Sequence, residues 1–557
     1  MKRRLFVNTM AASSFAATSA LAASTRAKEL HREVAVIGGG TGGCAAALGA
    51  LREGRRVVMT EECRWVGGQL TSQLVPPDEH PWIEMFGGTR MFRAYREAVR
   101  AYYRANFQLT EEARGRVPFN PGGGSVSGIT HEPRVSLAVL EAMLAPYIAS
   151  GQLTLLTEFR PVAADVVGDK LRAVTVEHMQ EKHRVTISAP YFIDATEQGD
   201  LLPLAKCEFV TGFESRSKTG EPSAPEKAQP DNIQSFTVCF AMEYRDGEDH
   251  VIDKPEDYGF WRNYVPAMKP AWPGKLLSWE MSNPVTLAKR NVSFDPRQDE
   301  GSAGGPLNLW LYRRIRRRKN YLNWEKDADI SLVNWPQNDY WLGNLHGVGE
   351  TEAAKHLRGG KQLSLSLLYW MQTEAPRADG KAGWPGLRLR HDQAGTEDGL
   401  AMYPYIRESR RIEAEFTVLE QHVSTALRGA AGAEKFADSV GTGSYRIDLH
   451  PSSGGDNYID VSSLPFQIPM GALIPKRIEN LLAGAKNLGV THITNGCYRL
   501  HPVEWNIGES AGALAAEALR TGEAPRKIRN DVKLRDAFQA RLRARGVQTE
   551  WPVLSPR

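Results

Sequence analysis

The sequence lacks the cysteine pattern of a disulfide-stapled or metal-binding protein. Only five of its 557 residues are cysteines, and no two of them form a CxxC pair. An odd number of cysteines cannot all pair within one chain, and their spacing matches no common metal site. We therefore expect buried thiols and no metal centre.

Strong charge of one sign and long apolar runs are missing as well. The net charge is only +4, whereas nucleic-acid binding usually needs a concentrated basic face. Beyond the N-terminal segment, no apolar run reaches the roughly 18 residues that suggest a membrane span. The sequence therefore predicts a globular protein of about two domains, without a nucleic-acid partner or a stable membrane span.

The first 23 residues are typical of a targeting segment. The basic run Lys2-Arg3-Arg4-Leu5-Phe6 precedes a weakly apolar stretch rich in Ala, Ser and Thr, which ends at the candidate cleavage site Ala20-Leu21-Ala22. Adjacent arginines favour the twin-arginine route over a plain Sec signal. That route moves folded proteins, so we expect a periplasmic protein with the twin-arginine translocase as its partner during export.

The strongest motif is a glycine-rich turn between a strand and a helix. Residues 33–37 form an apolar strand pattern, 42–53 a helix of small residues and 56–60 a second strand. The turn Gly38-Gly39-Gly40-Thr41-Gly42-Gly43 satisfies G-x-G-x-x-G in this context. Its glycines let the backbone approach a pyrophosphate, which the helix N-terminus attracts. Gly38, Gly40, Thr41 and Gly43 are therefore candidate cofactor residues.

An acidic residue ends the second strand of this unit. Glu61 follows Gly38 by 23 residues, the spacing at which a carboxylate accepts the two ribose hydroxyls of an adenosine. An acid at this position also disfavours a 2′-phosphate. The pattern predicts a dinucleotide site.

Several segments together resemble the FAD-dependent oxidoreductase family, with the two-domain fold of fumarate reductase flavoproteins and p-hydroxybenzoate hydroxylase. They are Arg64 to Thr71 with a second glycine pair, and residues 192–200, 405–412 and 480–512. The resemblance implies FAD as the cofactor. It also implies that the cofactor contacts Arg64, Gly67, Gly68, Asp194 and Thr196.

The sequence departs from the family pattern in two places. Glu197 replaces the glycine of an Ala-Thr-Gly turn, and Ala485-Lys486-Asn487 stands where many relatives carry Arg or Asp after the glycine. The segment around Lys486 still resembles the second cofactor motif of the family, which implies contacts from Gly484 and Gly508. A helix opening at Gly508 would aim its positive end at the flavin edge where negative charge develops.

The element pattern and the resemblance predict an α/β fold. Its Rossmann-like FAD-binding domain has three layers, with a central parallel sheet and a β-meander, and is discontinuous in sequence. The meander is assigned to residues 153–157, 171–177 and 183–187. Nine of the thirteen tryptophans fall between Trp261 and Trp384, and this stretch is assigned to an inserted α+β substrate or cap domain. The predicted parts are a signal peptide (1–23), the FAD-binding domain (30–205 and 430–525), the cap domain (206–429) and a C-terminal helical tail (526–557).

Residues 491–504 are expected to form a loop against the flavin ring, because they are dense in titratable groups. His501 is the first candidate for the base that takes a substrate proton, and His492 is the second. Glu504 and Tyr405 follow them. Arg499 would stabilise reduced flavin or bind a substrate anion. His80 is a weak candidate for covalent attachment of FAD.

Two arginine clusters invite other interpretations. Arg407, Arg410 and Arg411 suit an anionic substrate, although a helix carrying Glu408 and Glu413 would satisfy much of their charge. The basic run 313–319 is interpreted as a solvated helix face.

The leading hypothesis is an exported FAD-dependent dehydrogenase or oxidase. It would take a hydride from a polar organic substrate to flavin N5 and pass the electrons to a periplasmic acceptor or to oxygen. A flavin monooxygenase is the alternative, although only one dinucleotide fingerprint is visible. A third hypothesis is a non-catalytic flavoprotein or a glycan-binding envelope protein that uses the tryptophan-rich domain.

Overall fold

The computed structural model describes residues 28–301, 304–323 and 327–552, and all structural statements below concern these residues. The predicted targeting segment lies outside them. No helix in the described part of the chain is long and apolar enough to cross a membrane.

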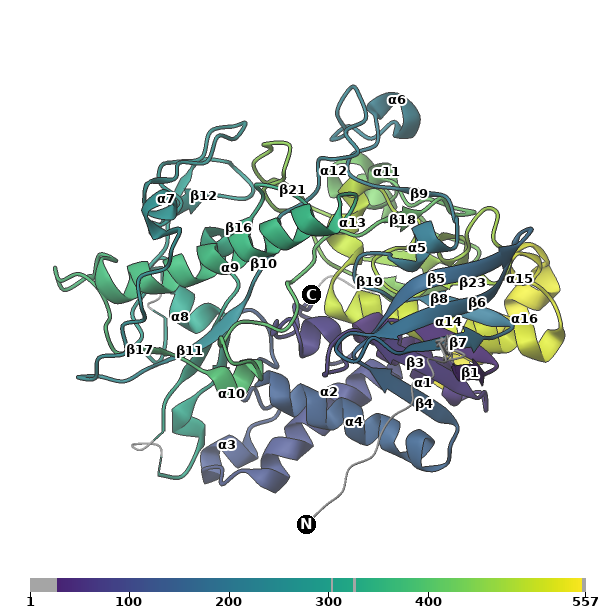
Figure 1. Ribbon diagram of the computed structural model, residues 1–557, viewed down its shortest axis with the longest axis horizontal. Coiled ribbons are helices and arrows are strands. Elements are labelled where there is room, and N and C mark those ends of the chain that lie inside the picture. The colour runs from purple at the N-terminus through teal and green to yellow at the C-terminus, as the bar shows by residue number, and fades with distance from the viewer. Residues whose placement is uncertain (1–27, 302–303, 324–326, 553–557) are drawn as a thin grey trace, which may run out of the picture.

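A five-stranded parallel sheet forms the centre of the larger domain (Figure 1). Its order is β23-β8-β2-β3-β4, so segments from both ends of the chain meet in one sheet. The strands β2 and β3 follow the expected positions closely. The strands are β2 (Val34–Ile37), β3 (Val57–Glu61), β4 (Leu153–Thr157), β8 (Tyr191–Asp194) and β23 (Leu481–Ala483).

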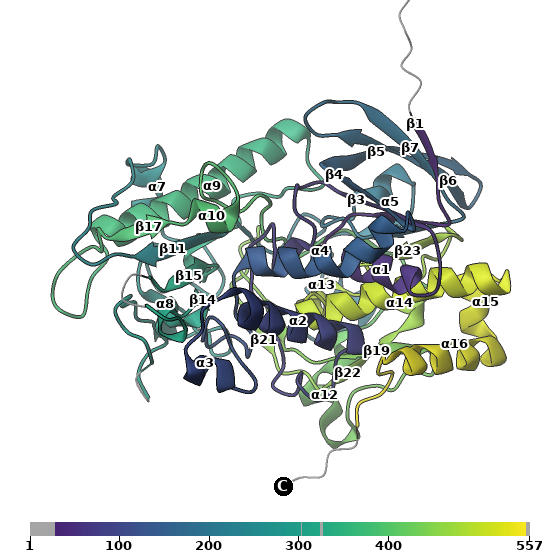
Figure 2. The same ribbon diagram turned by 90° about the horizontal axis from the view of Figure 1, so that it is seen from below.

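A helix pair and a β-meander cover the two sides of this sheet, which confirms the three-layer prediction (Figure 2). The helices are α1 (Thr41–Leu51) and α14 (His501–Thr521). The meander consists of β5 (Phe159–Val167), β6 (Lys170–His178) and β7 (Arg184–Ser188), with β1 (Lys28–His31) parallel to β7.

The meander prediction was wrong for residues 153–157, which pair with β3 in the parallel sheet. The strand β5 that takes their place was not expected. The reason is Glu158, which separates β4 from β5 with a φ of +63°. This position is a sharp turn without glycine or proline, so the sequence gives no turn signal there.

Helices α1 and α14 cross at a glycine contact. A Cβ atom on Gly508 would lie 2.0 Å from the Gly42 carbonyl oxygen, and one on Gly512 would lie 2.0 Å from the Ala46 carbonyl oxygen. The expected helix start at Gly508 was wrong, because α14 begins at His501, with Pro502 in its first turn. Gly508 is therefore a packing residue in the middle of the helix.

We expect Gly508→Ala to destabilise the protein by about 1–3 kcal/mol, because the new methyl group meets backbone that cannot move aside cheaply. Chemical denaturation of the purified variant measures this change. Gly115→Ala is the matched control, since nothing lies within 4 Å of a Cβ at that position. Equal unfolding free energies for both variants would contradict the packing role.

The smaller part of the molecule has its own hydrophobic core, formed by residues between Phe236 and Tyr458. Its antiparallel sheet has the order β14-β15-β11-β17, and the long helix α9 (Glu350–Thr373) packs beside it (Figure 1). Trp310, Trp335, Trp370 and Trp384 are fully buried, so these tryptophans fill the core. The strands are β11 (Phe240–Tyr244), β14 (Arg314–Arg316), β15 (Ile330–Val333) and β17 (Leu387–Leu389).

The C-terminal segment packs against the larger domain. It forms α15 (Pro525–Asn530) and α16 (Val532–Arg545), whose Ile528, Phe538 and Leu542 belong to the main hydrophobic core. Helices α2 (Arg90–Asn106) and α4 (Pro133–Ala149) also belong to this domain.

Neither arginine cluster lies on a helix that its own acids satisfy. In the run 313–319, Arg314 is buried in strand β14 and pairs with Asp299 and Asp329. The solvated helix face was therefore a wrong interpretation. Arg411 is likewise buried, between Glu408 and Glu214. Glu408, three positions before Arg411, neutralises part of the second cluster as expected, whereas Glu214, Asp299 and Asp329 lie outside the two runs.

Candidate active site

The glycine turn adopts the conformation that its sequence predicts. Gly38 has a φ of +101°, and a Cβ on Gly43 would lie 2.0 Å from the Gly38 carbonyl oxygen. The second glycine pair is tied to this turn, because Gly67 N–H donates to the Gly39 carbonyl (2.8 Å) and Thr41 Oγ1 donates to the Gly67 carbonyl (2.9 Å). The two glycine segments therefore form one wall.

A narrow cleft lies in front of this wall. Glu61 closes one end of it, with Oε2 accepting a hydrogen bond from Gly39 N–H (3.0 Å) and Oε1 from Cys63 N–H (2.8 Å). Burial and the neighbouring Glu197 carboxylate raise the pKa of Glu61 to about 8. The residues that line the cleft include Gly38, Gly40, Glu61, Gly68, Thr196 and Glu197.

Asp194 does not line the cleft but orders the turn at Thr196, which lies beside Gly38. Its Oδ1 accepts hydrogen bonds from the backbone N–H (3.0 Å) and the hydroxyl (2.7 Å) of Thr196, while its Oδ2 is buried without a partner. Asp194 therefore holds the turn, and Thr196 lines the cleft.

The two departures from the family pattern meet in space. The Lys486 ammonium group lies 2.5 Å from Glu197 Oε2 and 3.4 Å from Glu504 Oε2, and all three side chains are buried or nearly so. Glu504 Oε1 in turn accepts a hydrogen bond from Gly42 N–H at the start of α1 (3.3 Å). The negative charge of Glu197, which replaces a glycine, is thus balanced by the positive charge of Lys486.

Seven of the twelve expected cofactor residues do not line the cleft, namely Thr41, Gly43, Arg64, Gly67, Asp194, Gly484 and Gly508. Arg64 is exposed and donates to the Gly395 carbonyl (2.5 Å). Gly484 and Gly508 both pack against Gly42, and the backbone segments there lie too close together for a side chain. His80 also lies outside the cleft, bonded to the Gly87 carbonyl (3.0 Å).

A polar cavity of about 220 Å³ lies where residues of the smaller core meet the segment before α14. Arg499 and Leu500 form part of its wall. Gln69, which follows the second glycine pair, donates to the Arg499 carbonyl (3.0 Å). The chain segment 68–78 therefore runs from the cleft, which Gly68 lines, to the cavity, which Asp78 lines.

Polar atoms without partners lie along this segment. Both amide atoms of Gln73 and Oε1 of Gln69 are buried and have no hydrogen-bond partner among the described residues. Such groups are rare in native interiors unless a ligand or water satisfies them. Together with the glycine wall and Glu61, they fit a large polar cofactor that extends from the cleft towards the cavity.

His501 is bonded to the backbone through both ring nitrogens. Its Nδ1 accepts a hydrogen bond from Asp78 N–H (3.1 Å), and its Nε2 donates to the Val75 carbonyl (3.2 Å). Burial and the Arg313 cation lower the pKa of His501 to about 3. This geometry argues against the expected role as the base, because neither nitrogen is available to a substrate.

His492 lies in a buried ionic cluster away from the cavity. Its Nδ1 is 2.9 Å from Glu408 Oε1, and the centroid of its ring is 3.7 Å from the ring centroid of Phe213. The expected loop is also helical here, since Thr491 caps α13 (His492–Tyr498).

Of the residues named as catalytic candidates from the sequence, Arg499 and Tyr405 line the cavity. The Arg499 guanidinium donates to Tyr405 Oη (3.0 Å) and to the Asp448 carbonyl (2.9 Å).

Sequence reasoning missed His450, a half-buried histidine in the cavity wall. Its Nδ1 lies 2.6 Å from Oδ2 of the buried Asp339, whose Oδ1 pairs with Arg407 (2.9 Å). Although burial favours the neutral acid, Arg407 and His450 lower the pKa of Asp339. An ionised Asp339 therefore orients the imidazole, whose Nε2 lies 3.7 Å from Oδ2 of Asp448 in the cavity wall.

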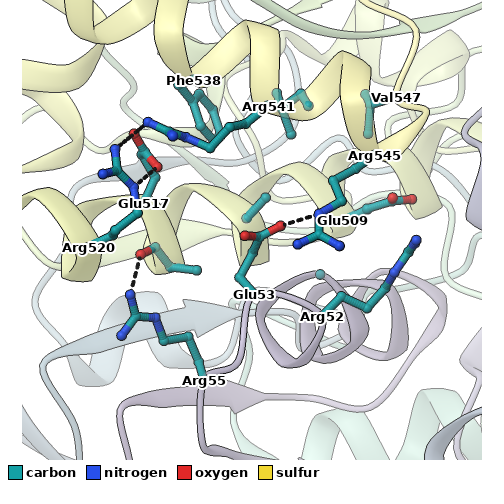
Figure 3. Close-up of a pocket in the computed structure, with 14 residues that line it drawn as sticks. Arg52, Glu53, Arg55, Glu509, Glu517, Arg520, Phe538, Arg541, Arg545 and Val547 are labelled. Carbon is teal, nitrogen blue, oxygen red and sulfur yellow. Dashed lines mark hydrogen bonds and ion pairs between the residues drawn. The ribbon is translucent and has the colours of Figure 1, made fainter.

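Two other polar clusters do not form part of this site. A pocket between α1, α14 and α16 is lined by paired charges, such as Arg541 with Glu517 (2.9 Å) and Arg545 with Glu53 (2.8 Å) (Figure 3). His178, Glu181 and His183 lie close together on the β6–β7 hairpin. There, His178 Nδ1 accepts two backbone N–H groups, which places the ring proton on Nε2 and leaves no lone pair for a metal.

The glycine cleft and the parallel sheet define a dinucleotide-binding enzyme fold. Residues 33–542 match the model of the FAD-dependent oxidoreductase family, and the chain belongs to this family. It is an FAD-dependent oxidoreductase, and FAD is its cofactor.

The solved structures that match this chain share little sequence with it. An E. coli quinol fumarate reductase is 12% identical over 93% of this chain and 74% of its own, with a TM-score of 0.33. The FAD complex of a Bacillus halodurans glycerol-3-phosphate dehydrogenase is 13% identical over 38% of this chain and 40% of its own, with a TM-score of 0.23. An L-proline dehydrogenase from P. horikoshii is 17% identical over 34% of this chain and only 25% of its own, with a TM-score of 0.17. Among curated proteins, no significant sequence match is found.

Proposed function

We propose that the protein is a dehydrogenase or oxidase that oxidises a polar organic substrate in the cavity beside Arg499. The observation that carries this proposal is the segment 68–78, which lines the FAD cleft at one end and the cavity at the other. A substrate in the cavity would therefore lie close to the cofactor. When bound, FAD supplies a two-electron acceptor.

The residues of the cleft would hold the cofactor. Gly38, Gly40 and Gly68 allow the backbone to approach the diphosphate, and the N-terminus of α1 attracts its charge. Glu61 lies where the adenosine ribose would bind, and Thr196 lines the cleft beside Gly38.

His450 is the group in the cavity best placed to take a proton. Oxidation of an alcohol or amine releases a proton from oxygen or nitrogen, and a positioned imidazole accepts it. Asp339 holds the Nδ1 side of the ring and stabilises the imidazolium that forms. The remaining nitrogen, Nε2, would face the substrate. Arg499 contributes positive charge in the same wall.

Anaerobic mixing tests this proposal directly. The FAD-loaded protein is mixed with alcohols, amines, polyols and hydroxy acids in turn, and the visible absorbance of the flavin is followed. We expect at least one class to bleach the flavin stoichiometrically. A flavin that only dithionite reduces would favour a non-catalytic flavoprotein instead.

We further propose export by the twin-arginine route to the periplasm, where an acceptor protein or oxygen would take the electrons. The pair Arg3-Arg4 supports this proposal. Changing both residues to lysine should leave FAD-loaded precursor in the cytoplasm, as measured by cell fractionation and immunoblotting. Normal export of that double variant, with Lys2→Arg as the matched control, would refute the twin-arginine assignment.

A further inference from the structure

The charged groups around the cavity do not balance. Five arginines line it, against the three aspartates Asp78, Asp448 and Asp460. Arg313 forms a double contact with Asp78 (3.2 Å and 3.2 Å), and Arg499 lies 3.3 Å from Asp448 Oδ2. The two remaining pairs are Arg446 with Asp460 and Arg407 with Asp339.

Arg290 is the arginine that is left over. No carboxylate lies within ion-pair distance of its guanidinium in the described part of the chain, although it lines the cavity and is half-buried. It lies on β13 (Lys289–Asn291), opposite Met281 of β12 (Glu280–Ser282). The cavity therefore carries an excess positive charge that a ligand can neutralise.

From the unpaired Arg290 in the cavity wall we infer that the substrate is a hydroxy acid, anchored through its carboxylate at Arg290. A guanidinium binds a carboxylate well. The same surroundings disfavour a cationic amine. This inference rests on the proposed function, since it names the substrate class of the same site.

The size of the cavity agrees with this class. Its volume of about 220 Å³ corresponds to roughly seven waters at ~30 Å³ each, which is room for a small organic acid. The half-buried rings of Tyr312 and Tyr445 form part of the wall and can pack against a carbon chain.

The reaction balances without a further co-reactant. The C–H bond of the CH–OH group breaks, and the hydride carries both electrons to FAD. The hydroxyl proton goes to His450, and the C–O bond becomes a carbonyl. The hydroxy acid is thus oxidised to a keto or aldehydo acid, while the cofactor is reduced.

Calorimetric titration of the FAD-loaded protein tests the inference with matched ligand pairs. The pairs are D-gluconate with D-glucitol, D-glucuronate with D-glucose, and L-lactate with propylene glycol, which differ in the carboxylate. We expect at least one acid to bind about 10-fold or more tightly than its neutral partner, and we expect added salt to weaken that binding.

Arg290→Gln should remove the preference for the acid over its neutral partner. The substitution breaks no ion pair, because no carboxylate of the described residues pairs with Arg290. Lys289→Gln is the control, because it makes the same charge change on the neighbouring residue, whose exposed side chain points to the other face of the strand. Failure of all three acids to bind, or tighter binding of the neutral partners, would overturn the inference. The loss of preference in Lys289→Gln alone would also overturn it.

The same titration separates this inference from the proposed function. If an acid binds at Arg290 but never bleaches the flavin under anaerobic conditions, the ligand class stands and the proposed oxidation fails. If a neutral polyol bleaches the flavin while no acid binds, the oxidation stands and the hydroxy-acid inference fails.

Discussion

Replacing Gly40 by valine is expected to abolish FAD retention while the chain stays folded. A Cβ atom at this position lies 2.5 Å from Glu197 Oε1, so the new side chain enters the space between the glycine turn and Gly68. Glu197 Oε1 is the end of a flexible side chain and can move aside, which is why the fold should survive. The diphosphate, in contrast, loses the close approach of backbone that glycine permits.

We expect FAD affinity to fall by at least ~100-fold, or about 2.7 kcal/mol. The FAD released on denaturation, per mole of chain, measures retention, and circular dichroism confirms the fold. Gly259→Val is the control, because its Cβ meets nothing within 4 Å. If Gly40→Val keeps the wild-type FAD content, the cofactor does not bind at the glycine turn.

Replacing His450 by glutamine should slow substrate-driven flavin reduction by a factor of ~10² to 10⁴. The variant keeps a polar side chain in the cavity wall but no longer accepts a proton at the Nε2 position. FAD content and substrate affinity should stay near the wild-type values, because His450 does not line the cleft. Rapid mixing without oxygen isolates the reductive step from the later transfer to an acceptor.

His391→Gln is the control, since His391 is exposed and lies outside the cavity. An unchanged rate of flavin reduction in His450→Gln would show that His450 is not the base, and Tyr405 or another cavity residue would be the next candidate.

The dinucleotide half of the fold could be predicted because its signals are local. Strand β2, the glycine turn and helix α1 follow one another directly, and each glycine there has a steric reason that a motif can encode. Where the local signal was absent, the prediction failed. The turn at Glu158 has no glycine, and the true start of α14 at His501 was overlooked in favour of Gly508.

The substrate half of the site could not be predicted, because its pairs are distant in sequence. Asp339 and His450 are 111 positions apart and belong to no motif. The run that begins at Arg313 looked solvent-exposed because its partner Asp78 lies 235 positions away. Glu197 and Lys486 each departed from the family pattern, and only the fold shows that they pair. The composition gives the number of positive charges in the chain, but tertiary contacts determine where they lie.

The central claim is that the cavity beside Arg499 is where substrate meets FAD, and filling that cavity tests it most directly. Leu307 is a half-buried residue of the cavity wall that does not line the FAD cleft. The measurement is anaerobic flavin bleaching in Leu307→Trp, with whichever substrate reduces the wild-type protein. We predict that this variant retains FAD, that dithionite reduces it fully, and that the substrate no longer bleaches it. Bleaching at the wild-type rate would contradict the claim and place the reaction outside this cavity.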